Sequence, residues 1–262
     1  MTFTPGSRFS VAGMSESNSL QGLAVVITGG GTGIGRAAAR QFAAAGANVL
    51  VTGRTEGTLN ETAEGTGVRT VVADVATAEG RAAIVDAAVR QFGRIDVLVN
   101  NAAITRPAAL GEIDPDVAEQ QFVTNLTGPL FLTQSALPHI GAGGIIINIT
   151  SNTPDRGWHG NSVYGATKVA MDFLTKTWAL ELADRGIRVV SVAPGITQTP
   201  ILTNAGLTSE QIESAMQYVS RIPLSRPAEP DEIAWWLVAV ARPEAGYLTG
   251  QVIRVDGGLS AA

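Results

Sequence analysis

Short runs of apolar, β-branched residues alternate with longer helical patterns along most of the chain. The runs are apolar throughout rather than at every second position, which is typical of strands that are covered on both faces. Strands that alternate with helices predict parallel pairing through right-handed crossovers, and so an α/β doubly wound parallel sheet. The predicted strands are Leu23–Thr28, Asn48–Thr52, Arg69–Val72, Val97–Val99, Ile145–Ile149, Arg188–Ala193 and Val252–Val255. The helical patterns include Gly35–Ala45, Glu79–Phe92, Ser162–Ala183 and Pro230–Arg242.

Composition bounds the class of protein. Residues 1–20 are rich in small polar residues without periodicity and predict a flexible N-terminal extension, and residues 21–262 are expected to form one domain. The formal net charge of −5 does not support a nucleic-acid binding surface, so no nucleic-acid partner is expected. The absence of cysteine excludes disulfides and thiolate sites, and two histidines are too few for a histidine-built centre, so no metal site is predicted.

The distribution of apolar residues bears on membrane contact. No strongly apolar run approaches the roughly 20 residues that span a bilayer. The first twenty residues also lack the apolar stretch of a secretory signal. We therefore expect a cytoplasmic protein.

The first predicted strand leads directly into the glycine-rich segment Thr28–Gly35, which an alanine-rich helix follows. Glycines permit positive φ and let the main chain approach a ligand closely. A pyrophosphate would then lie at the positive end of the helix dipole. In this strand–turn–helix context the segment predicts a dinucleotide-binding site, whereas elsewhere the same glycines would be an ordinary loop.

Gly29, Gly33 and Gly35 follow the spacing G-x-x-x-G-x-G. The motifs that follow in order are Asn100-Asn101-Ala102-Ala103, Asn125, Ser151, Tyr164-x-x-x-Lys168 and Pro194-Gly195. With these motifs, residues 20–258 resemble the short-chain dehydrogenase/reductase family, which implies a Rossmann-like sheet with helices on both faces. The family usually has glycine where this chain has Ala103, and the methyl group removes no functional group.

The resemblance implies a nicotinamide-dependent oxidoreductase and assigns its cofactor site. Residues of the glycine turn would line the phosphates, Asp74 and Val75 would face the adenine, and Asn101 would lie by the adenosine-side ribose. A helix cap or a solvated loop carboxylate is the competing interpretation of Asp74. The cofactor-binding residues implied are Gly29, Gly31, Thr32, Gly33, Ile34, Arg54, Asp74, Val75, Asn101, Tyr164, Lys168, Pro194, Gly195, Thr197 and Thr199.

The end of the second predicted strand bears on the choice between NAD and NADP. An Asp or Glu about 20 residues beyond the glycines would hydrogen-bond the ribose 2′-hydroxyl and favour NAD. Gly53 stands there instead, and Arg54 follows it. A guanidinium matches the doubly charged 2′-phosphate, so the sequence favours NADP(H). NAD(H) stays open, because a solvated arginine stacked on adenine would give the same sequence.

Hydride exchange with an alcohol carbon needs a group that moves the hydroxyl proton. Tyr164 and Lys168 lie four residues apart, so a helix places them on one face, and the cation is expected to lower the tyrosine pKa from about 10. Ser151 precedes Tyr164 by 13 residues and would stabilise charge on the substrate oxygen, with Thr150 as the rival hydroxyl. The resemblance adds Asn125 as a proton relay to the lysine through water, so the implied catalytic residues are Asn125, Ser151, Tyr164 and Lys168. The alternative for Asn125 is a helix kink with local hydrogen bonds only.

Two segments, 152–163 and 196–220, are expected to form the walls of the substrate pocket, the second moving as a lid. Their largely apolar side chains suit an uncharged or partly aromatic ketone. His159 is expected to line the mouth, because the family has no catalytic histidine there. The predicted pocket residues are Ser151, Trp158, His159, Ile201 and Leu202.

These features predict an NADP(H)-dependent ketoreductase that interconverts a secondary alcohol and a ketone, with Tyr164 as general acid and base. One alternative is a 3-oxoacyl-thioester (acyl-carrier-protein) reductase of fatty-acid synthesis, in which Arg106 and Arg156 would dock the acidic carrier. An alternative of another class is a non-catalytic NADP-sensing binding protein on the same fold.

The helix predicted at Pro230–Arg242 is apolar nearly all round. Neighbouring helical residues point about 100° apart, so Trp235 and Trp236 cannot share one narrow stripe, and the helix must be buried on more than one face. The last predicted strand, Val252–Val255, is expected to end as a sheet edge. The chain's own loops are one possible cover for both. The resemblance implies a homotetramer built through this helix and strand, so the predicted partners are further copies of the chain and a small-molecule substrate.

Overall fold

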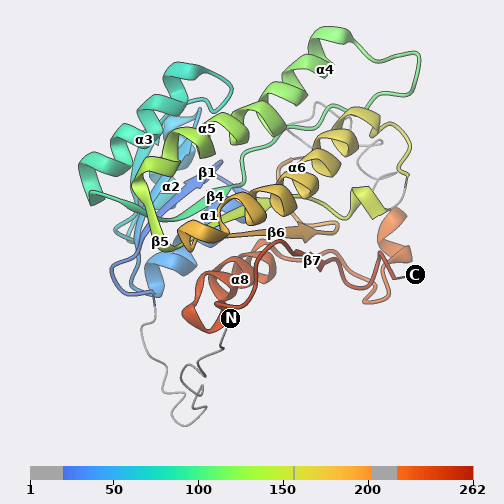
Figure 1. Cartoon of the computed structure of the whole chain (residues 1–262). Coiled ribbons are helices and arrows are strands. Elements are labelled where there is room, and N and C mark those ends of the chain that lie inside the picture. The colour runs from blue at the N-terminus through green and yellow to red at the C-terminus, as the bar shows by residue number, and fades with distance from the viewer. Residues whose placement is uncertain (1–19, 156, 202–216, 262) are drawn as a thin grey trace.

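A seven-stranded parallel sheet forms the centre of the molecule (Figure 1). The computed structural model describes residues 20–155, 157–201 and 217–261. The strands follow the order β3-β2-β1-β4-β5-β6-β7, which confirms the predicted doubly wound sheet. Their bounds are β1 Ala24–Thr28, β2 Asn48–Gly53, β3 Arg69–Val72, β4 Ile95–Asn100, β5 Ile140–Ile149, β6 Arg188–Pro194 and β7 Val252–Val255.

The predicted strands lie within one or two residues of the observed ones, except at β5. This strand begins at Ile140 rather than Ile145, because Ile140 pairs with Ile95 of β4 before the register shifts. The glycines that follow Ile140 hide this first part of the strand from an apolar pattern.

The helices join successive strands. The four predicted helices are confirmed as α1, α3, α6 and α8, and the sequence analysis named none of α2, α4 and α5. The bounds are α1 Gly33–Ala44, α2 Glu56–Ala63, α3 Ala78–Phe92, α4 Pro115–Phe122, α5 Gly128–Ala136, α6 Ser162–Glu181 and α8 Pro230–Ala241. Short turns of helix are the π-helical η1 Val123–Thr127 and the 3-10 segments η2 Leu137–His139, η3 Thr153–Asp155, η4 Ala183–Arg185, η5 Gln217–Arg221 and η6 Pro243–Ala245.

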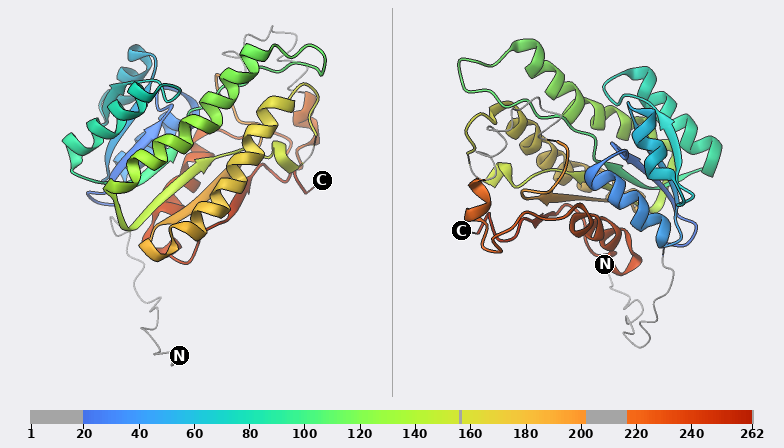
Figure 2. Two further views of the ribbon diagram at one scale, coloured as in Figure 1. Left: turned by 45° about the horizontal axis from the view of Figure 1, so that its top comes forward. Right: turned by 180° about the vertical axis from the view of Figure 1, so that it is seen from behind.

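The helices cover the sheet on both faces (Figure 2). Alternate residues of β1 belong to the buried clusters on its two faces. Val25 and Ile27 of β1 pack with α1 and α8, whereas Val26 packs with α3, α5 and α6. Burial on both faces explains why the strands read as continuous apolar runs.

A buried chain of polar side chains fastens α6 to the sheet. Asn100 of β4 donates from Nδ2 to Oδ1 of Asn148 on β5 at 2.9 Å. Asn148 in turn donates to the Thr175 hydroxyl of α6 at 2.9 Å, and that hydroxyl lies 2.7 Å from the hydroxyl of Ser191 on β6. Because buried polar groups left unpaired are costly, these bonds fix the position of α6 against β5 and β6.

Several predictions from the sequence fall outside the described residues. Leu202 and most of the predicted lid belong to 202–216, and nearly all of the predicted N-terminal extension belongs to 1–19. Leu20, the last residue assigned to that extension, is buried in the core. Within the described ranges, no helix combines the length and apolarity that crossing a bilayer requires.

Candidate active site

A cavity of about 1040 Å³ opens at the carboxyl ends of the strands. In doubly wound sheets ligands bind at this edge, next to the point where the strand order reverses, which here lies between β1 and β4. The volume reaches the upper end of the usual range for small-molecule sites, so it accommodates a large ligand. The turn after β1 and the ends of β2 to β6 all contribute residues to its lining.

The turn between β1 and α1 is too closely packed for side chains. Gly29 and Gly33 have positive φ angles of 64° and 50°. A Cβ atom at Gly31 would come within 2.5 Å of the Thr58 hydroxyl, and one at Gly35 would collide with the Gly29 carbonyl. Gly31, Thr32, Gly33 and Ile34 line the cavity, where α1 begins. Such a cradle at a helix N-terminus suits a pyrophosphate, so the residues present fit the dinucleotide that the sequence predicts.

Asn101 joins this turn to the end of β4. Its side-chain amide donates to the carbonyls of Thr28 and Gly29, at 2.8 and 3.1 Å. The Thr28 hydroxyl accepts from the backbone N–H groups of Asn101 and Ala102, at 3.0 Å each. Asn101 also lines the cavity, as predicted for a ribose neighbour, but its amide hydrogens serve the fold.

The ends of β2 and β3 form the adenosine end of the predicted cofactor site. Gly53 and Arg54 line the cavity, and Arg54 is exposed. Asp74 and Val75 line it as well. One carboxylate oxygen of Asp74 accepts from the Ala76 N–H at 2.9 Å, while Thr77 caps α3, so Asp74 itself is no helix cap.

Ser151, Tyr164 and Lys168 come together on the cavity wall. Ser151 follows β5, and the other two lie one turn apart on α6. Lys168 Nζ donates to the Ile149 carbonyl at 2.9 Å and lies 5.5 Å from the centre of the Tyr164 ring. The Ser151 hydroxyl lies 2.7 Å from that of Thr153. The sequence spacing therefore identified three side chains that share one wall.

The expected lowering of the tyrosine pKa is wrong, because the pKa of Tyr164 lies above its ordinary value. Burial raises the pKa of Tyr164 to about 12, and a hydrogen bond with Ser151 offsets this only in part. Burial likewise lowers the pKa of Lys168 to about 8. Desolvation disfavours the charged form of each group, the phenolate of Tyr164 and the ammonium of Lys168. At neutral pH the site therefore holds a protonated phenol next to an ammonium group.

Asn125 lies behind the cavity wall rather than on it. It is buried within the π-helical turn η1, a distortion often found at functional sites. Its amide makes a pair of 2.8 Å bonds with the N–H and carbonyl of Ile104 and donates to the Thr167 hydroxyl at 3.3 Å. Thr167 donates to the Tyr164 carbonyl at 2.7 Å, so Asn125 is linked to α6 through local bonds.

Another part of the cavity lining is aromatic and apolar. Trp158, His159 and Ile201 line it, as the sequence predicts for the substrate pocket. Tyr218 of η5 lines it too, with its ring centre 4.9 Å from that of Trp158. The cofactor candidates Pro194, Gly195, Thr197 and Thr199 also border the cavity, and Thr197 donates to the Gly195 carbonyl at 3.1 Å.

Asp172 is a neighbour of the site that the sequence analysis missed. It follows Lys168 by four residues on α6, just as Lys168 follows Tyr164, so the three side chains lie on one face of the helix. The same four-residue spacing could have found it in the sequence. Its carboxylate raises the pKa of Lys168 against the effect of burial. Burial raises the pKa of Asp172 itself, and Arg254 of β7, which is paired with Asp155, opposes that rise.

Comparison with known proteins identifies relatives along almost the whole chain. Residues 29–260 match the model of a family described as enoyl-(acyl carrier protein) reductase. The 3-oxoacyl-[acyl-carrier-protein] reductase FabG of Thermotoga maritima is 38% identical over 92% of this chain and 98% of its own length. An NADPH-dependent aldehyde reductase of Arabidopsis thaliana is 38% identical over 96% of this chain and 91% of its own. The crystal structure of a short-chain dehydrogenase/reductase of Brucella melitensis, titled glucose/ribitol dehydrogenase, superimposes with a TM-score of 0.86 at 33% identity, covering 92% of this chain and 98% of that one.

The influence of Asp172 on Lys168 generates a prediction. Asp172→Asn removes a carboxylate that stabilises the ammonium form, so the pKa of Lys168 is expected to fall below its value of about 8. The chain contains two lysines, Lys168 and Lys176, so ¹³C labelling of the lysine ε carbons gives two signals, and Lys168→Met assigns them. The measurement is the midpoint of the Lys168 signal in a pH titration.

Asp184→Asn is the matched control, because Asp184 is an exposed carboxylate on η4 beyond the end of α6. It is expected to leave the midpoint of Lys168 unchanged. An unchanged midpoint in Asp172→Asn would contradict the electrostatic coupling.

Proposed function

Because the chain belongs to the short-chain dehydrogenase/reductase family of oxidoreductases, we propose that it transfers a hydride between NADP(H) and a secondary alcohol or ketone. The observation that carries the proposal is the shared cavity. Ser151, Tyr164 and Lys168 lie on one wall of the same space that the glycine turn borders. A nucleotide cradle and a set of proton-transfer groups thus face one ligand volume.

The nucleotide would be held by the residues around the turn. Backbone groups of Gly31 to Ile34 would bind the diphosphate at the start of α1, and Arg54 would pair with the 2′-phosphate. Asp74 and Val75 would contact the adenine side. The bound nicotinamide supplies the hydride or accepts it, and the chain's own residues handle the proton.

Tyr164 would give its phenolic proton to the carbonyl oxygen during reduction. A pKa of about 12 keeps the phenol protonated at neutral pH, which is the form that a general acid requires. Ser151 would donate to the same oxygen and stabilise its developing charge. The ammonium group of Lys168 would stabilise the phenolate left after transfer. Asn125 would hold the Ile104 backbone and the start of α6 in place, with a water-mediated relay as its proposed second role.

The substrate would be a ketone with an apolar or aromatic substituent. Trp158, Ile201 and Tyr218 supply apolar surface to the same cavity that Ser151 and Tyr164 line. A 3-oxoacyl thioester is the second candidate, which the Thermotoga maritima relative and the lining residue Arg106 favour. A protein that senses NADP without catalysis would bind the nucleotide and reduce neither class of substrate.

We predict that Tyr164→Phe abolishes nearly all turnover while NADPH still binds, because the change removes one oxygen atom and leaves the cradle intact. NADPH oxidation is followed at its absorbance with a panel of ketones and 3-oxoacyl thioesters, and binding by the fluorescence of the bound nucleotide. Tyr247→Phe is the control, since Tyr247 is fully exposed near the start of β7. Turnover like that of the wild type in Tyr164→Phe would contradict the mechanism.

A second prediction concerns the choice of nucleotide. An arginine–phosphate pair contributes about 1.5–3 kcal/mol, equivalent to roughly 10–150-fold in affinity. Arg54→Ala is therefore expected to raise the KM for NADPH by a factor in this range and to leave that for NADH nearly unchanged. Equal affinity of the wild-type protein for the two nucleotides would remove the basis of the NADP preference.

We also propose a homotetramer, in which α8 and β7 form one contact between subunits. Trp235 and Trp236 of α8 are 57% and 37% exposed and pack edge to face, with ring centres 5.1 Å apart. β7 is the last strand of the sheet. A second apolar surface, not anticipated from the sequence, lies on α6, where Phe173 is 67% and Leu180 82% exposed. Two separate apolar faces suit an assembly with two kinds of symmetric contact.

Light scattering at micromolar concentration is expected to give a mass several times the 27.1 kDa of one chain. Trp235→Glu places a charge within the proposed contact and should lower that mass. Glu244→Gln, on the exposed turn after α8, is the control and should leave it unchanged. A wild-type protein with the mass of one chain would contradict the assembly.

A further inference from the structure

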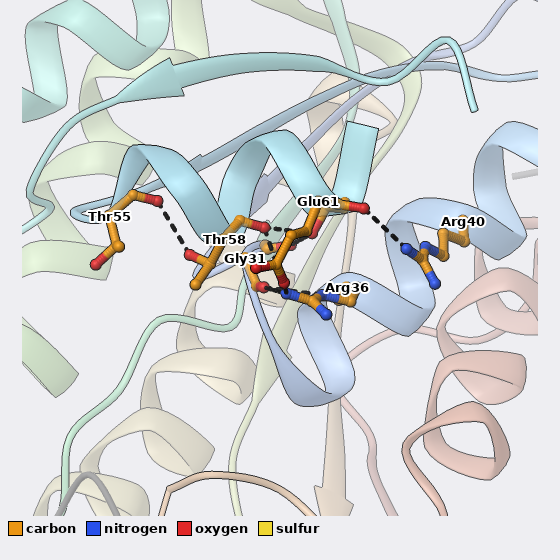
Figure 3. Close-up of polar contacts among 8 residues, drawn as sticks. Gly31, Arg36, Arg40, Thr55, Thr58 and Glu61 are labelled. Carbon is orange, nitrogen blue, oxygen red and sulfur yellow. Dashed lines mark hydrogen bonds and ion pairs between the residues drawn. The ribbon is translucent and has the colours of Figure 1, made fainter. Parts of the chain in front are cut away.

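The side chain of Arg36 in α1 reaches back to the glycine turn (Figure 3). Its Nε and Nη2 atoms donate to the Gly31 carbonyl at 2.9 and 2.5 Å. Nη2 also lies 2.7 Å from the carboxylate of Glu61 and 3.4 Å from the Thr58 carbonyl, both on α2. We call this group of Arg36, Gly31, Thr58 and Glu61 the Arg36 clamp. It ties the turn, α1 and α2 to one guanidinium group.

These contacts differ from those of an ordinary surface ion pair. An exposed pair of this kind contributes about 0–1 kcal/mol, and the Glu61 side chain is indeed largely exposed. The Arg36 side chain is only 27% exposed and makes two of its bonds to a single main-chain oxygen. A planar guanidinium that binds in this way fixes the direction of the carbonyl group.

The direction of the Gly31 carbonyl determines that of the next N–H group. The peptide bond between Gly31 and Thr32 is planar and trans, so its C=O and N–H point in opposite directions. Gly31 and Thr32 line the cavity, whereas Arg36 is not part of its wall. With the carbonyl held toward Arg36, we infer that the Thr32 N–H points away from Arg36 and toward the cavity that Thr32 lines. Glycine has the most freedom to rotate this peptide, so the turn needs an external restraint.

The clamp also fixes α2 relative to the turn. Thr62 of α2 donates to the Gly30 carbonyl at 2.9 Å, beside the Arg36 contacts to Gly31 and Glu61. The residues that lead into α2, Arg54 and Thr55, border the adenosine end of the cavity. The two ends of the predicted nucleotide site, the diphosphate cradle and the start of α2, are therefore connected through Arg36.

We propose that Arg36 is a positioning residue for nucleotide binding, which holds the Gly31–Thr32 peptide and α2 in the arrangement that the dinucleotide requires. This inference rests on the proposed function and extends it to a side chain outside the cavity. Arg36 acts on the diphosphate cradle, which NADPH and NADH share, whereas Arg54 faces the 2′-phosphate that only NADPH carries. Loss of Arg36 is therefore expected to weaken the binding of both nucleotides, whereas loss of Arg54 is expected to weaken that of NADPH alone.

Arg36→Met is the test, because it keeps an unbranched side chain that matches the stem of arginine as far as Nε and removes every donor. The Kd for NADPH and the Kd for NADH are both expected to rise about 10-fold, equivalent to about 1.4 kcal/mol. The loss should appear in the nucleotide KM rather than in kcat at saturating nucleotide. Kd is measured by titration calorimetry, so the result does not depend on knowing the substrate.

Arg40→Met is the matched control. Arg40 lies one turn further along α1, and its guanidinium donates at 2.9 Å to the main-chain carbonyl of Glu61, which belongs to α2 and not to the turn (Figure 3). It is expected to leave both Kd values unchanged. Thermal unfolding without nucleotide checks that each variant is folded. If Arg36→Met fails to fold, Arg36→Lys replaces it, since an ammonium group keeps the charge but cannot make the two parallel bonds to Gly31, and both Kd values should still rise.

The outcomes separate this inference from the proposed function. If the wild type binds nucleotide and Arg36→Met binds both with unchanged Kd, the positioning role is wrong while the function stands. A rise confined to NADPH would also overturn it, because Arg36 would then act as a phosphate contact. A wild type that binds neither nucleotide overturns the proposed function together with the inference.

Discussion

The hydrogen bonds between Thr28 and Asn101 fix the ends of β1 and β4 next to each other, and the candidate site depends on that contact. The Thr28 hydroxyl donates to the Val99 carbonyl of β4 and accepts from the Asn101 N–H, and the Thr28 carbonyl accepts from the Asn101 side-chain amide. The turn that follows β1 must then pass so close to β4 and α1 that only glycine fits at Gly29 and Gly35. The same close packing leaves backbone groups, rather than side chains, to face the cavity at the start of α1.

The second half of the site is set by the attachment of α6 to the sheet. The buried chain from Asn148 to Thr175 holds the helix against β5 and β6. Its stripe of Tyr164, Lys168 and Asp172 then runs past the end of β5, where Ser151 lies and where the Ile149 carbonyl accepts from Lys168. One sheet edge thus brings a backbone cradle and a row of titratable side chains into a single cavity.

Structural features that depend on residues close together in the chain could be predicted from the sequence. Apolar runs located the seven strands, and spacing located Tyr164, Lys168 and the glycine turn. Effects that depend on the packed fold could not be predicted in this way. The pKa of Tyr164 rises because the side chain is buried and its hydrogen bond with Ser151 offsets this only in part, and the extent of burial cannot be read from residue spacing. The Arg36 clamp joins residues 25 positions apart, and Asn125 in the π-helical turn pairs with Ile104, 21 positions away. None of these contacts leaves a periodic signal.

In the proposed reaction hydride passes directly between the nicotinamide and a carbonyl carbon while the chain supplies the proton. NADPH that carries deuterium at the transferring position of the nicotinamide tests this, with the alcohol product of a ketone analysed by mass spectrometry. Direct transfer places one deuterium atom on the carbinol carbon of the product and none in the solvent. Deuterium released to water, or no uptake by any ketone or 3-oxoacyl thioester of a broad panel, would contradict it.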